Sequence, residues 1–418
     1  MRCRDPLPVA IQAEIIKACC EDDVINLERL LNDGKTVSNV LLHSDILGAS
    51  YIDHFGSFEY LTPLQLSAVC GSWRCLQLLI THRALVNFEV AKTDRHIYQP
   101  LYLCVRSSRE NPEKRTGYEK SIKLLLDAGA KPSLGEERFY GSLLHLVVDL
   151  KLDASILDEL IKHGAEVNKV NARHFTPLHQ ALIQEREIGS DYISTLLAHT
   201  PDVNKQDNLG RTALTLSAEY GLVDVVYKLH KHAPNYDILT YTSETALHCA
   251  CRNGHIEIIS MLIEKSCKIN HTNSNGYTAL DLFIKALSKV MSDDAKSPRK
   301  VAKCLQKLLN FGAFMNDFQP VTLKPMLQHQ YIHRYTQTLC LIINSLDYID
   351  LYEIIDQTHV TSDNEILFEQ LFVLGNGPRT LRHLCRCTIR RCIRTPCHFV
   401  RNLPLPELLK SYLLLDVK

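Results

Sequence analysis

The sequence has no excess of charge of either sign and no long apolar run. Its 418 residues contain 47 lysines and arginines against 47 aspartates and glutamates, so no overall field would steer the molecule to nucleic acid or to an anionic membrane. The start, MRCRDPLPVAIQAEIIKACCEDD, has charges scattered through it and lacks the apolar core of a secretory signal. No segment reaches about 18 consecutive apolar residues, as a membrane span would. We therefore expect no nucleic acid and no membrane as partners.

Disulfide and catalytic patterns are missing as well. The 15 cysteines are odd in number and follow no regular framework, and a chain of this length needs no disulfides to fold. We therefore expect a reducing compartment, the cytoplasm, with the nucleus as an alternative. No phosphate-binding loop, nucleophile elbow or zinc-protease motif is present. We expect no enzyme activity and no cofactor, although a dispersed catalytic pair of Cys and His stays open at this point.

What the sequence does contain is a repeat with a period near 33 residues. Seven variants of one motif read TPLQLSA, QPLYLCV, SLLHLVV, TPLHQAL, TALTLSA, TALHCAC and TALDLFI, and they start at Thr62, Gln99, Ser142, Thr176, Thr212, Thr245 and Thr278. Successive starts are 37, 43, 34, 36, 33 and 33 residues apart. Thr is a good N-cap, and Pro in the next position loses no hydrogen bond. The motif therefore predicts the start of a helix.

Signals for a turn, a second helix and a polar loop follow the motif. Gly71, Gly221 and Gly254 lie nine residues after the threonine, where a left-handed residue ends a short helix. An apolar segment such as HIEIISMLIEK comes next. Short polar segments then close the repeats at Asn87, Asn168, Asn204 and Asn270. The predicted repeat is helix, turn, helix and loop.

These residues resemble ankyrin repeats, about seven of them between residues 58 and 316. The resemblance implies an all-α fold, a solenoid of helix pairs with hairpin loops, in which stacking buries the apolar face of each pair. Tyr60, His174 and Ser243 replace the hairpin glycine that Gly210 and Gly276 supply, and Lys151 and Glu185 replace the glycine between the helices. We expect distorted hairpins and turns at those five positions.

The segments outside the repeats also show helical apolar spacing. Residues 10–33 place Ile15, Leu27 and Leu30 on apolar faces, which predicts a helical cap within an N-terminal segment, residues 1–57, that ends in a linker. Residues 317–377 lose the repeat but keep apolar runs, which predicts a connector of two or three helices on the last repeat. Charged insertions from Ser107 and Ser288 are expected to be exposed loops.

The motif TALHCAC places His248, Cys249 and Cys251 close together, as metal ligands would be. His248, however, occupies the motif's own histidine position, as His179 does in TPLH, and no second cysteine pair has zinc-finger spacing. We predict no metal here. The histidine is expected to be structural, with a ring nitrogen that bridges the loops of adjacent repeats.

The last segment, residues 378–418, is basic and rich in cysteine. Residues 378–401 contain seven arginines and no acid, a composition that also suits a tail that binds nucleic acid or zinc. On a helix, however, Leu381, Leu384, Cys385, Ile389 and Cys392 form one apolar stripe, and Arg382, Arg386, Arg390 and Arg394 lie on another face. The cysteines lack the C-x-x-C spacing of a zinc site. The pattern favours an apolar helix face that contacts a partner.

This segment resembles a SOCS box. TLRHLCRCTI, residues 380–389, is similar to the pattern that binds Elongin, and LPLPELLKSYL, residues 403–413, is similar to a cullin box. The resemblance implies that Elongin C, with Elongin B, binds Thr380, Leu381, Leu384, Cys385 and Ile389. It implies that cullin-5, with its RING partner, binds Leu403, Pro404, Leu405, Pro406 and Leu409.

The chain as a whole is similar to the ankyrin repeat and SOCS box family. This resemblance implies a substrate-recognition subunit of a ubiquitin ligase, which holds a protein for ubiquitination and degradation and acts through proximity. Target contacts are expected at the hairpin tips, at Lys169, Asn171, Arg173, Lys205, Asp207, His271 and Asn273. The alternative is an ankyrin scaffold or adaptor whose C-terminal helices only cap the solenoid.

Overall fold

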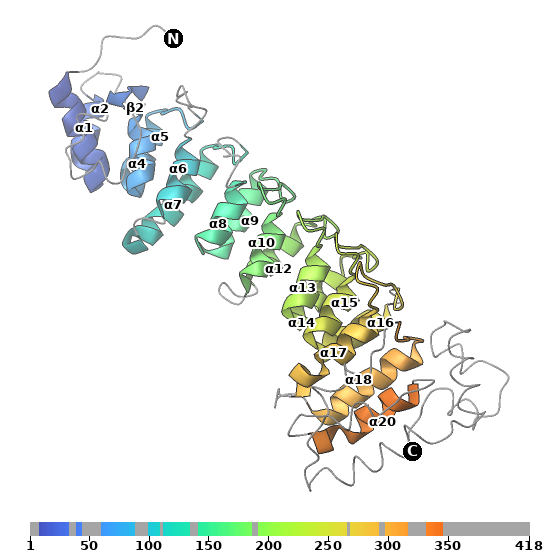
Figure 1. The fold of residues 1–418 in the computed structure, drawn as a ribbon. Coiled ribbons are helices and arrows are strands. Elements are labelled where there is room, and N and C mark those ends of the chain that lie inside the picture. Colours follow the sequence, from blue (N-terminus) through green and yellow to red (C-terminus); the bar gives the residue numbers. More distant parts are fainter. Residues whose placement is uncertain are drawn as a thin grey trace. The chain divides into compact units, whose positions relative to one another are not determined.

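A computed structural model describes residues 8–32, 39–43, 60–87, 99–108, 112–133, 141–185, 191–265, 268–291, 297–316 and 332–345. Within these ranges the chain forms successive helix pairs (Figure 1). The predicted all-α architecture of helix pairs is therefore confirmed. The chain divides into two compact units, Met1–Asp202 and Val203–Lys418.

The first unit contains five helix pairs and a short two-stranded sheet within its described residues. The helices are α1 (Val9–Glu21), α2 (Val24–Asn32), α4 (Pro63–Cys70), α5 (Trp73–Thr81), α6 (Pro100–Ser107), the 3-10 turn η3 (Pro112–Lys114), α7 (Arg115–Asp127), α8 (Leu143–Asp149), α9 (Ala154–Lys162), α10 (Pro177–Ile183) and α12 (Asp191–Ala198). The strands β1 (Leu42–His43) and β2 (Tyr60–Leu61) pair antiparallel. This ladder was not predicted.

The second unit contains three helix pairs and one further helix within its described residues. They are α13 (Ala213–Tyr220), α14 (Val223–His230), α15 (Ala246–Asn253), α16 (Ile256–Glu264), α17 (Ala279–Met291), α18 (Pro298–Asn310), the 3-10 turn η5 (Ile332–Tyr335) and α20 (Thr336–Ser345). Helix α20 packs against α18 and buries Leu339 and Ile342. It is one of the two or three helices predicted for the connector; residues 346–377 lie outside the described part of the chain.

The motif starts and stops helices as predicted. In α4, the Gln65 amide donates to Thr62 Oγ1 at 3.2 Å, and the Thr62 amide donates to Gln65 Oε1 at 2.8 Å. Pro63 occupies the first helical position, where it removes no helix bond. The helix ends at Gly71, whose φ of +67° is left-handed. The cap, proline and glycine therefore fix both ends of an eight-residue helix.

The expected distortion of the glycine-free hairpins and turn is wrong where the structure describes the residue's conformation. His174 and Ser243 adopt φ of +56° and +58°, and Lys151 adopts +53°. The His174 amide donates to the Asn171 carbonyl at 2.9 Å and the Ser243 amide to the Thr240 carbonyl at 2.8 Å. These bonds hold a left-handed residue that costs about 1 kcal/mol without glycine. Tyr60 lies in β2 instead, and the turn after Glu185 lies outside the described residues.

Both charged insertions lengthen helices, so the expectation of loops is wrong for most of their described residues, whereas most of their described charged side chains are exposed as expected. The insertion from Ser107 runs through η3 into α7, where Tyr118 is fully buried and its hydroxyl donates to the Val69 carbonyl at 2.7 Å. The insertion from Ser288 continues α17 as far as Met291, and α18 begins at Pro298. In the first insertion, the burial of Tyr118 and its bond to the Val69 carbonyl anchor the charged segment to the preceding repeat.

The core runs along the first helices of the repeats. Helix α4 packs against α6, and α13 packs against α15, and Ala68, Ala218 and Ala250 are fully buried there. A small side chain at this position lets neighbouring helices approach closely. The predicted N-terminal pair forms as well, because Ile15 and Leu27 of α1 and α2 are fully buried.

Candidate functional site

Three successive hairpins of the second unit share one backbone design. The amides of Asp207, Thr240 and Asn273 each donate at 2.9 Å to the carbonyl four residues later. The side-chain oxygens of Asp207, Thr240 and Asn273 also accept from the amide of the residue four positions later. These bonds, from Arg211, Glu244 and Tyr277, measure 2.8, 3.0 and 3.0 Å respectively. The polar side chain at the start of each hairpin therefore fixes its backbone, an arrangement that Asp, Asn and Thr favour in turns.

Adjacent hairpins are joined to one another through main-chain atoms. The Tyr241 amide donates to the Leu209 carbonyl at 3.0 Å, and the Ser274 amide donates to the Thr242 carbonyl at 3.0 Å. Gln206 Nε2 adds a bond to the Leu239 carbonyl at 2.9 Å. The hairpins are thus held at fixed spacing by main-chain bonds that do not use the side chains of Leu209 and Tyr241.

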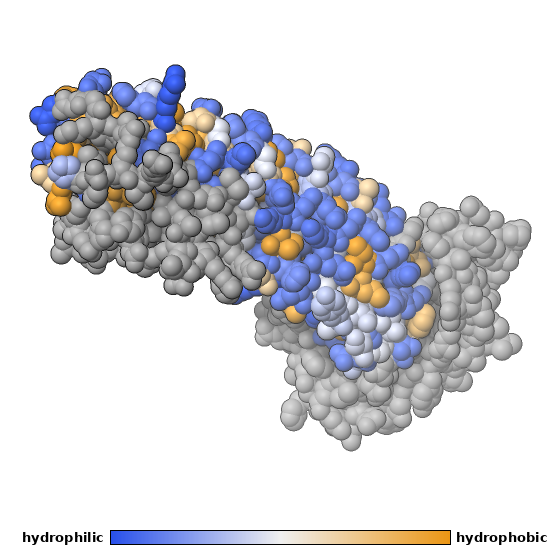
Figure 2. All heavy atoms as spheres, turned by 90° about the horizontal axis from the view of Figure 1, so that it is seen from above, coloured by the Kyte–Doolittle hydropathy of each residue, from blue (hydrophilic) through white to orange (hydrophobic). Residues whose placement is uncertain are grey.

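The exposed side chains at these tips include two large apolar groups. Leu209 is 52% exposed and Tyr241 is 73% exposed. Isolated exposed apolar side chains are ordinary, but these two belong to hairpins that are directly hydrogen-bonded. Over the described residues, the face in Figure 2 is mostly hydrophilic with small separate hydrophobic spots. Exposed apolar side chains on neighbouring hairpins suit contact with a protein surface more than enclosure of a small molecule.

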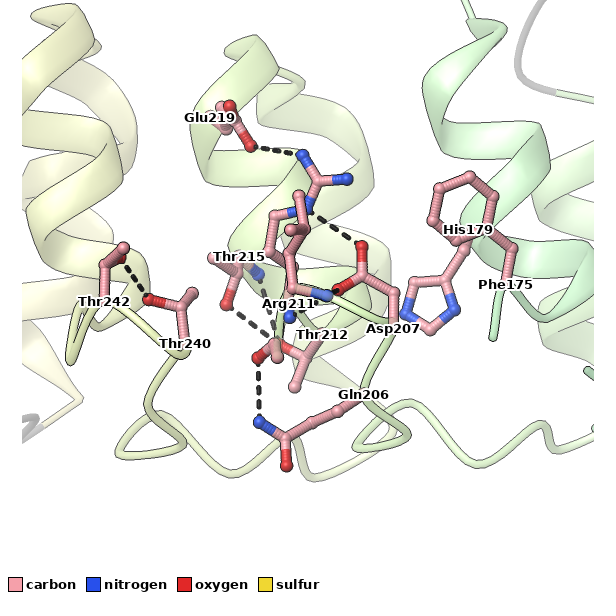
Figure 3. Close-up of polar contacts among 12 residues, drawn as sticks. Phe175, His179, Gln206, Asp207, Arg211, Thr212, Thr215, Glu219, Thr240 and Thr242 are labelled. Carbon is pink, nitrogen blue, oxygen red and sulfur yellow. Dashed lines mark hydrogen bonds and ion pairs between the residues drawn. The ribbon is translucent and has the colours of Figure 1, made fainter. Parts of the chain in front are cut away.

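The charged side chains beside the tips are paired. Arg211 Nε contacts Asp207 Oδ2 at 2.9 Å, and Arg211 Nη1 contacts Glu219 Oε2 at 3.3 Å (Figure 3). Arg252 pairs with Glu244, which also accepts from Asn273 Nδ2 at 3.0 Å. Three carboxylates face two guanidinium groups here, so most of the charge is compensated within the protein and the pairs hold the hairpins in place.

The structure places the residues predicted to contact a target at different depths. Asp207 is 2% exposed and Asn273 is 6% exposed, because both side chains organise their hairpins. Asn171 has the same role in the first unit, where its Oδ1 accepts from the Arg173 and Phe175 amides at 2.9 and 3.0 Å. Arg173 is exposed, whereas Lys169, Asn171, Lys205 and His271 are half-buried.

The sequence did not point to Leu209 and Tyr241, because the residue type at the tip changes from one hairpin to the next. A signal for them exists. Each lies between the polar residue that starts a hairpin and the left-handed residue that ends it, Gly210 or Ser243. Positions between those two landmarks are the ones that the backbone leaves exposed.

His248 bridges adjacent repeats, as predicted. Its Nδ1 accepts from the Thr245 amide at 3.2 Å and contacts the Thr245 hydroxyl at 2.8 Å. Its Nε2 donates to the His271 carbonyl in the next repeat at 2.9 Å. His145 makes the equivalent bonds, with Ser142 at 3.1 and 2.9 Å and with the Phe175 carbonyl at 2.8 Å. Both rings act as structural links.

These links predict that the protein loses stability in mild acid. Burial lowers the pKa of His248 from its ordinary 6.5 to about 4, and burial also lowers the pKa of His145. Below pH 6.5, therefore, the histidine is protonated in the unfolded chain, while the buried ring in the folded protein stays neutral. We expect His248 alone to lower the free energy of unfolding by about 2 kcal/mol between about pH 7 and about pH 5. Urea unfolding at these two pH values measures the change in the free energy of unfolding.

The control for this prediction is His248→Gln. Gln65 shows that glutamine can accept from the N-cap amide in the same position, and glutamine does not titrate. The variant should lose some stability at neutral pH, because the bond to His271 is lost. Between about pH 7 and about pH 5, the free energy of unfolding of the variant should fall by about 2 kcal/mol less than that of the wild type. An equal loss in both proteins would contradict the assigned role.

The asparagines that close the repeats also link neighbours. Asn204 Oδ1 accepts from the Asn235 amide at 2.7 Å, and Asn168 Oδ1 accepts from the Asp202 amide at 2.8 Å. Asn270 both donates to the Gly312 carbonyl at 2.8 Å and accepts from the Phe314 amide at 3.0 Å. The sequence showed these residues as loop ends; their role in joining repeats becomes visible only in the structure.

The residues predicted to bind Elongin C and cullin-5 lie outside the described residues. Within the described part, no group of three or more His, Cys, Asp or Glu side chains could hold a metal ion. No helix among the described residues is long and apolar enough to cross a membrane.

Comparisons with known proteins find the same two kinds of domain. A family model of ankyrin repeats matches residues 144–240 and 229–289, and a family model of the SOCS box matches residues 377–414. Among solved structures, the chain is similar to the ankyrin repeat domain of Bcl-3, a member of the IkappaB protein family. That likeness has 22% identity and a TM-score of 0.42, and it covers 53% of this chain and 93% of the other.

Two relatives extend the similarity beyond the repeats. Ankyrin repeat and SOCS box protein 16 of Homo sapiens is 26% identical over 311 residues, an alignment that covers 71% of this chain and 64% of that protein. The chain thus spans less than two thirds of the human relative. The Mus musculus protein of the same name is 24% identical over 436 aligned positions, which cover 100% of this chain and 87% of the relative. The chain therefore combines ankyrin repeats with a SOCS box, and it is a distant homologue of Ankyrin repeat and SOCS box protein 16.

Proposed function

We propose that this chain is the substrate-recognition subunit of a ubiquitin ligase that contains Elongin B, Elongin C and cullin-5. The observation that carries the proposal is the SOCS box at residues 377–414, which follows ankyrin repeats in the same chain. The SOCS box recruits the ligase, and the repeats hold a protein target. The chain itself contributes no catalytic group, because holding the target beside the conjugating enzyme is sufficient to raise the rate of ubiquitin transfer.

The division of labour within the SOCS box follows its two motifs. The stripe of Leu381, Leu384, Cys385 and Ile389, which Thr380 precedes as a cap, contacts Elongin C. The segment Leu403–Pro406, together with Leu409, contacts cullin-5. An apolar helix face gains free energy by entering a groove on a partner, and prolines reduce the entropy that an extended contact segment loses on binding. Co-purification of the full chain with Elongins B and C tests the proposal.

The target side of the proposal rests on the hairpin tips. Arg173 in the first unit and Leu209 and Tyr241 in the second are exposed on hairpins that main-chain hydrogen bonds hold. Lys169, Asn171, Lys205 and His271 flank the tips and supply polar atoms at their edge. Asp207 and Asn273 contribute indirectly, because they fix the hairpins that present the exposed groups. An exposed aromatic or arginine side chain with a polar rim is the composition of many binding hot spots.

Replacing the two tip residues is expected to release the target. Leu209→Asp combined with Tyr241→Asp should reduce target labelling at least about tenfold, because each introduces a charge where apolar contact is needed. Proximity labelling in cells, with the labelling enzyme fused to the chain, measures the loss. Elongin binding should be unchanged.

The matched control is Tyr227→Asp. Tyr227 is 64% exposed but lies on α14, the second helix of its repeat. It should keep the full set of labelled proteins. If Tyr227→Asp removes the same proteins and the tip variant keeps them, the target surface lies on the second helices and the tip assignment is wrong.

A further inference from the structure

Two thiols from different helices meet near the N-terminal end of the first unit. Cys20 lies in the last turn of α1 and Cys70 is the last residue of α4, and these helices pack together. The Cys70 thiol donates to Cys20 Sγ at a sulfur–sulfur distance of 3.4 Å. Neither residue belongs to the target surface or the SOCS box, so the proposed function leaves this contact unexplained.

Two further cysteines that the structure describes near this contact, Cys19 and Cys75, are protonated and inaccessible. Cys19 and Cys75 are fully buried, and the Cys75 thiol donates to the Ala18 carbonyl at 3.5 Å. Burial raises the pKa of the Cys19 thiol to about 12 and raises the pKa of Cys75 as well. Both stay protonated at neutral pH, and a protonated thiol is a poor nucleophile.

Cys20 differs from its neighbours because Cys70 donates to it. This hydrogen bond lowers the pKa of Cys20 against the opposing effect of burial, and the positive charge of Lys114 lowers it further, while Glu21 raises it. Lys114 is held close, since its Nζ donates to the Cys70 carbonyl at 3.3 Å. Cys20 is 7% exposed, and Cys70 beside it is partly exposed. A small oxidant can therefore reach the pair.

We propose that Cys20 and Cys70 form an oxidation site for hydrogen peroxide, at which a disulfide joins α1 to α4. The Cys20 thiolate attacks one peroxide oxygen, the O–O bond breaks, and hydroxide leaves and is protonated to water. Cys70 sulfur then attacks the sulfur of the Cys20 sulfenic acid, and its proton leaves with the hydroxyl group as a second water. Two thiols lose two electrons to one peroxide. The sulfur atoms approach from 3.4 Å to about 2.05 Å.

The disulfide would fasten the N-terminal helix pair to the next repeat. In a repeat array each repeat contacts only its neighbours, so the terminal pair opens most easily. A covalent link between α1 and α4 removes that opening. Two molecules of a thiol such as glutathione reduce the disulfide and become one oxidised glutathione, so the link is reversible.

The test is peroxide titration of the purified full chain at neutral pH, followed by blocking of free thiols and mapping of peptides without reduction. We expect a Cys20–Cys70 peptide that forms at least about tenfold faster than Cys340 is oxidised. Cys340 is the matched control, because it is also partly exposed but burial raises its pKa. In the oxidised protein, amide hydrogen exchange in α1 should slow at least about tenfold.

Variants keep the proposal falsifiable. Cys70→Ser should abolish the cross-link and leave Cys20 as a sulfenic acid that a dimedone probe captures. Cys340→Ser should leave the cross-link intact. The proposal is overturned if Cys20 and Cys340 are oxidised at equal rates, if Cys20 pairs with another cysteine, or if amide exchange in α1 does not change on oxidation.

Discussion

Wild-type chain co-expressed with Elongins B and C is expected to purify as a complex, and the variant Leu381→Asp, Cys385→Asp is expected to purify without them. On a helix these residues lie four apart and point to the same side. Two carboxylates would then enter an apolar pocket without a partner. Each change should cost at least about 2 kcal/mol, so the pair should weaken binding roughly a thousandfold. Size-exclusion chromatography and calorimetry measure the loss.

Two control variants separate this result from misfolding. Arg386→Ala changes the same predicted helix on its arginine face and should retain both Elongins. Replacing Leu403, Pro404, Leu405 and Pro406 by alanine should retain the Elongins and release cullin-5. If the double aspartate variant still binds both Elongins, the chain is better described as an ankyrin scaffold whose tail only caps the repeats.

Gly210→Ala is expected to destabilise the second unit far more than Gly276→Ala. Both glycines are left-handed, with φ of +75° and +79°, and so both variants lose about 1 kcal/mol to backbone strain. An added Cβ at Gly210 would lie 2.8 Å from the Tyr241 amide nitrogen, whereas one at Gly276 meets nothing within 4 Å. The clash is with main chain that cannot rotate away. It should raise the total cost to about 3 kcal/mol.

Urea unfolding of the two variants, compared with the wild type, measures this difference. Gly276→Ala serves as the matched control, since it has the same backbone conformation without the clash. Equal losses would show that backbone strain alone matters and that the Tyr241–Leu209 bond adjusts. Loss of target labelling by Gly210→Ala at a temperature where it stays folded would further connect hairpin spacing with recognition.

The helix pairs could be predicted because their signals are local. Thr62 with Gln65 and Gly71 fixes a helix within ten residues, and His248 could be assigned a structural role because it recurs at a fixed place in the motif. The structure shows that four residue types can occupy that place, because the side chain of each forms a hydrogen bond with the N-cap threonine. They are Gln65, Thr215, His248 and Asp281. This position requires a side chain that can form a hydrogen bond with the N-cap threonine, and several residue types meet that requirement.

The rest depends on contacts between segments that are distant in the sequence. Tyr118 lies among charges and breakers, and its burial depends on its bond to the Val69 carbonyl and on the close approach of its ring to Gly71. His174 and Ser243 adopt left-handed conformations because the hairpin bonds require them. Leu209 and Tyr241 become neighbours only when their repeats stack. Spacing within one repeat locates these hairpin positions, but it does not show which contacts they make with other repeats.

The bonds that join one hairpin to the next have a consequence for how such a chain can change over generations. They run between main-chain atoms, from Tyr241 to Leu209 and from Ser274 to Thr242, so they survive almost any exchange of the side chains there. Substitution of an exposed residue usually alters stability by less than about 0.5 kcal/mol. If the repeats hold a protein target as proposed, a lineage can exchange one target for another by altering a few tip residues while the main-chain bonds between the hairpins are kept.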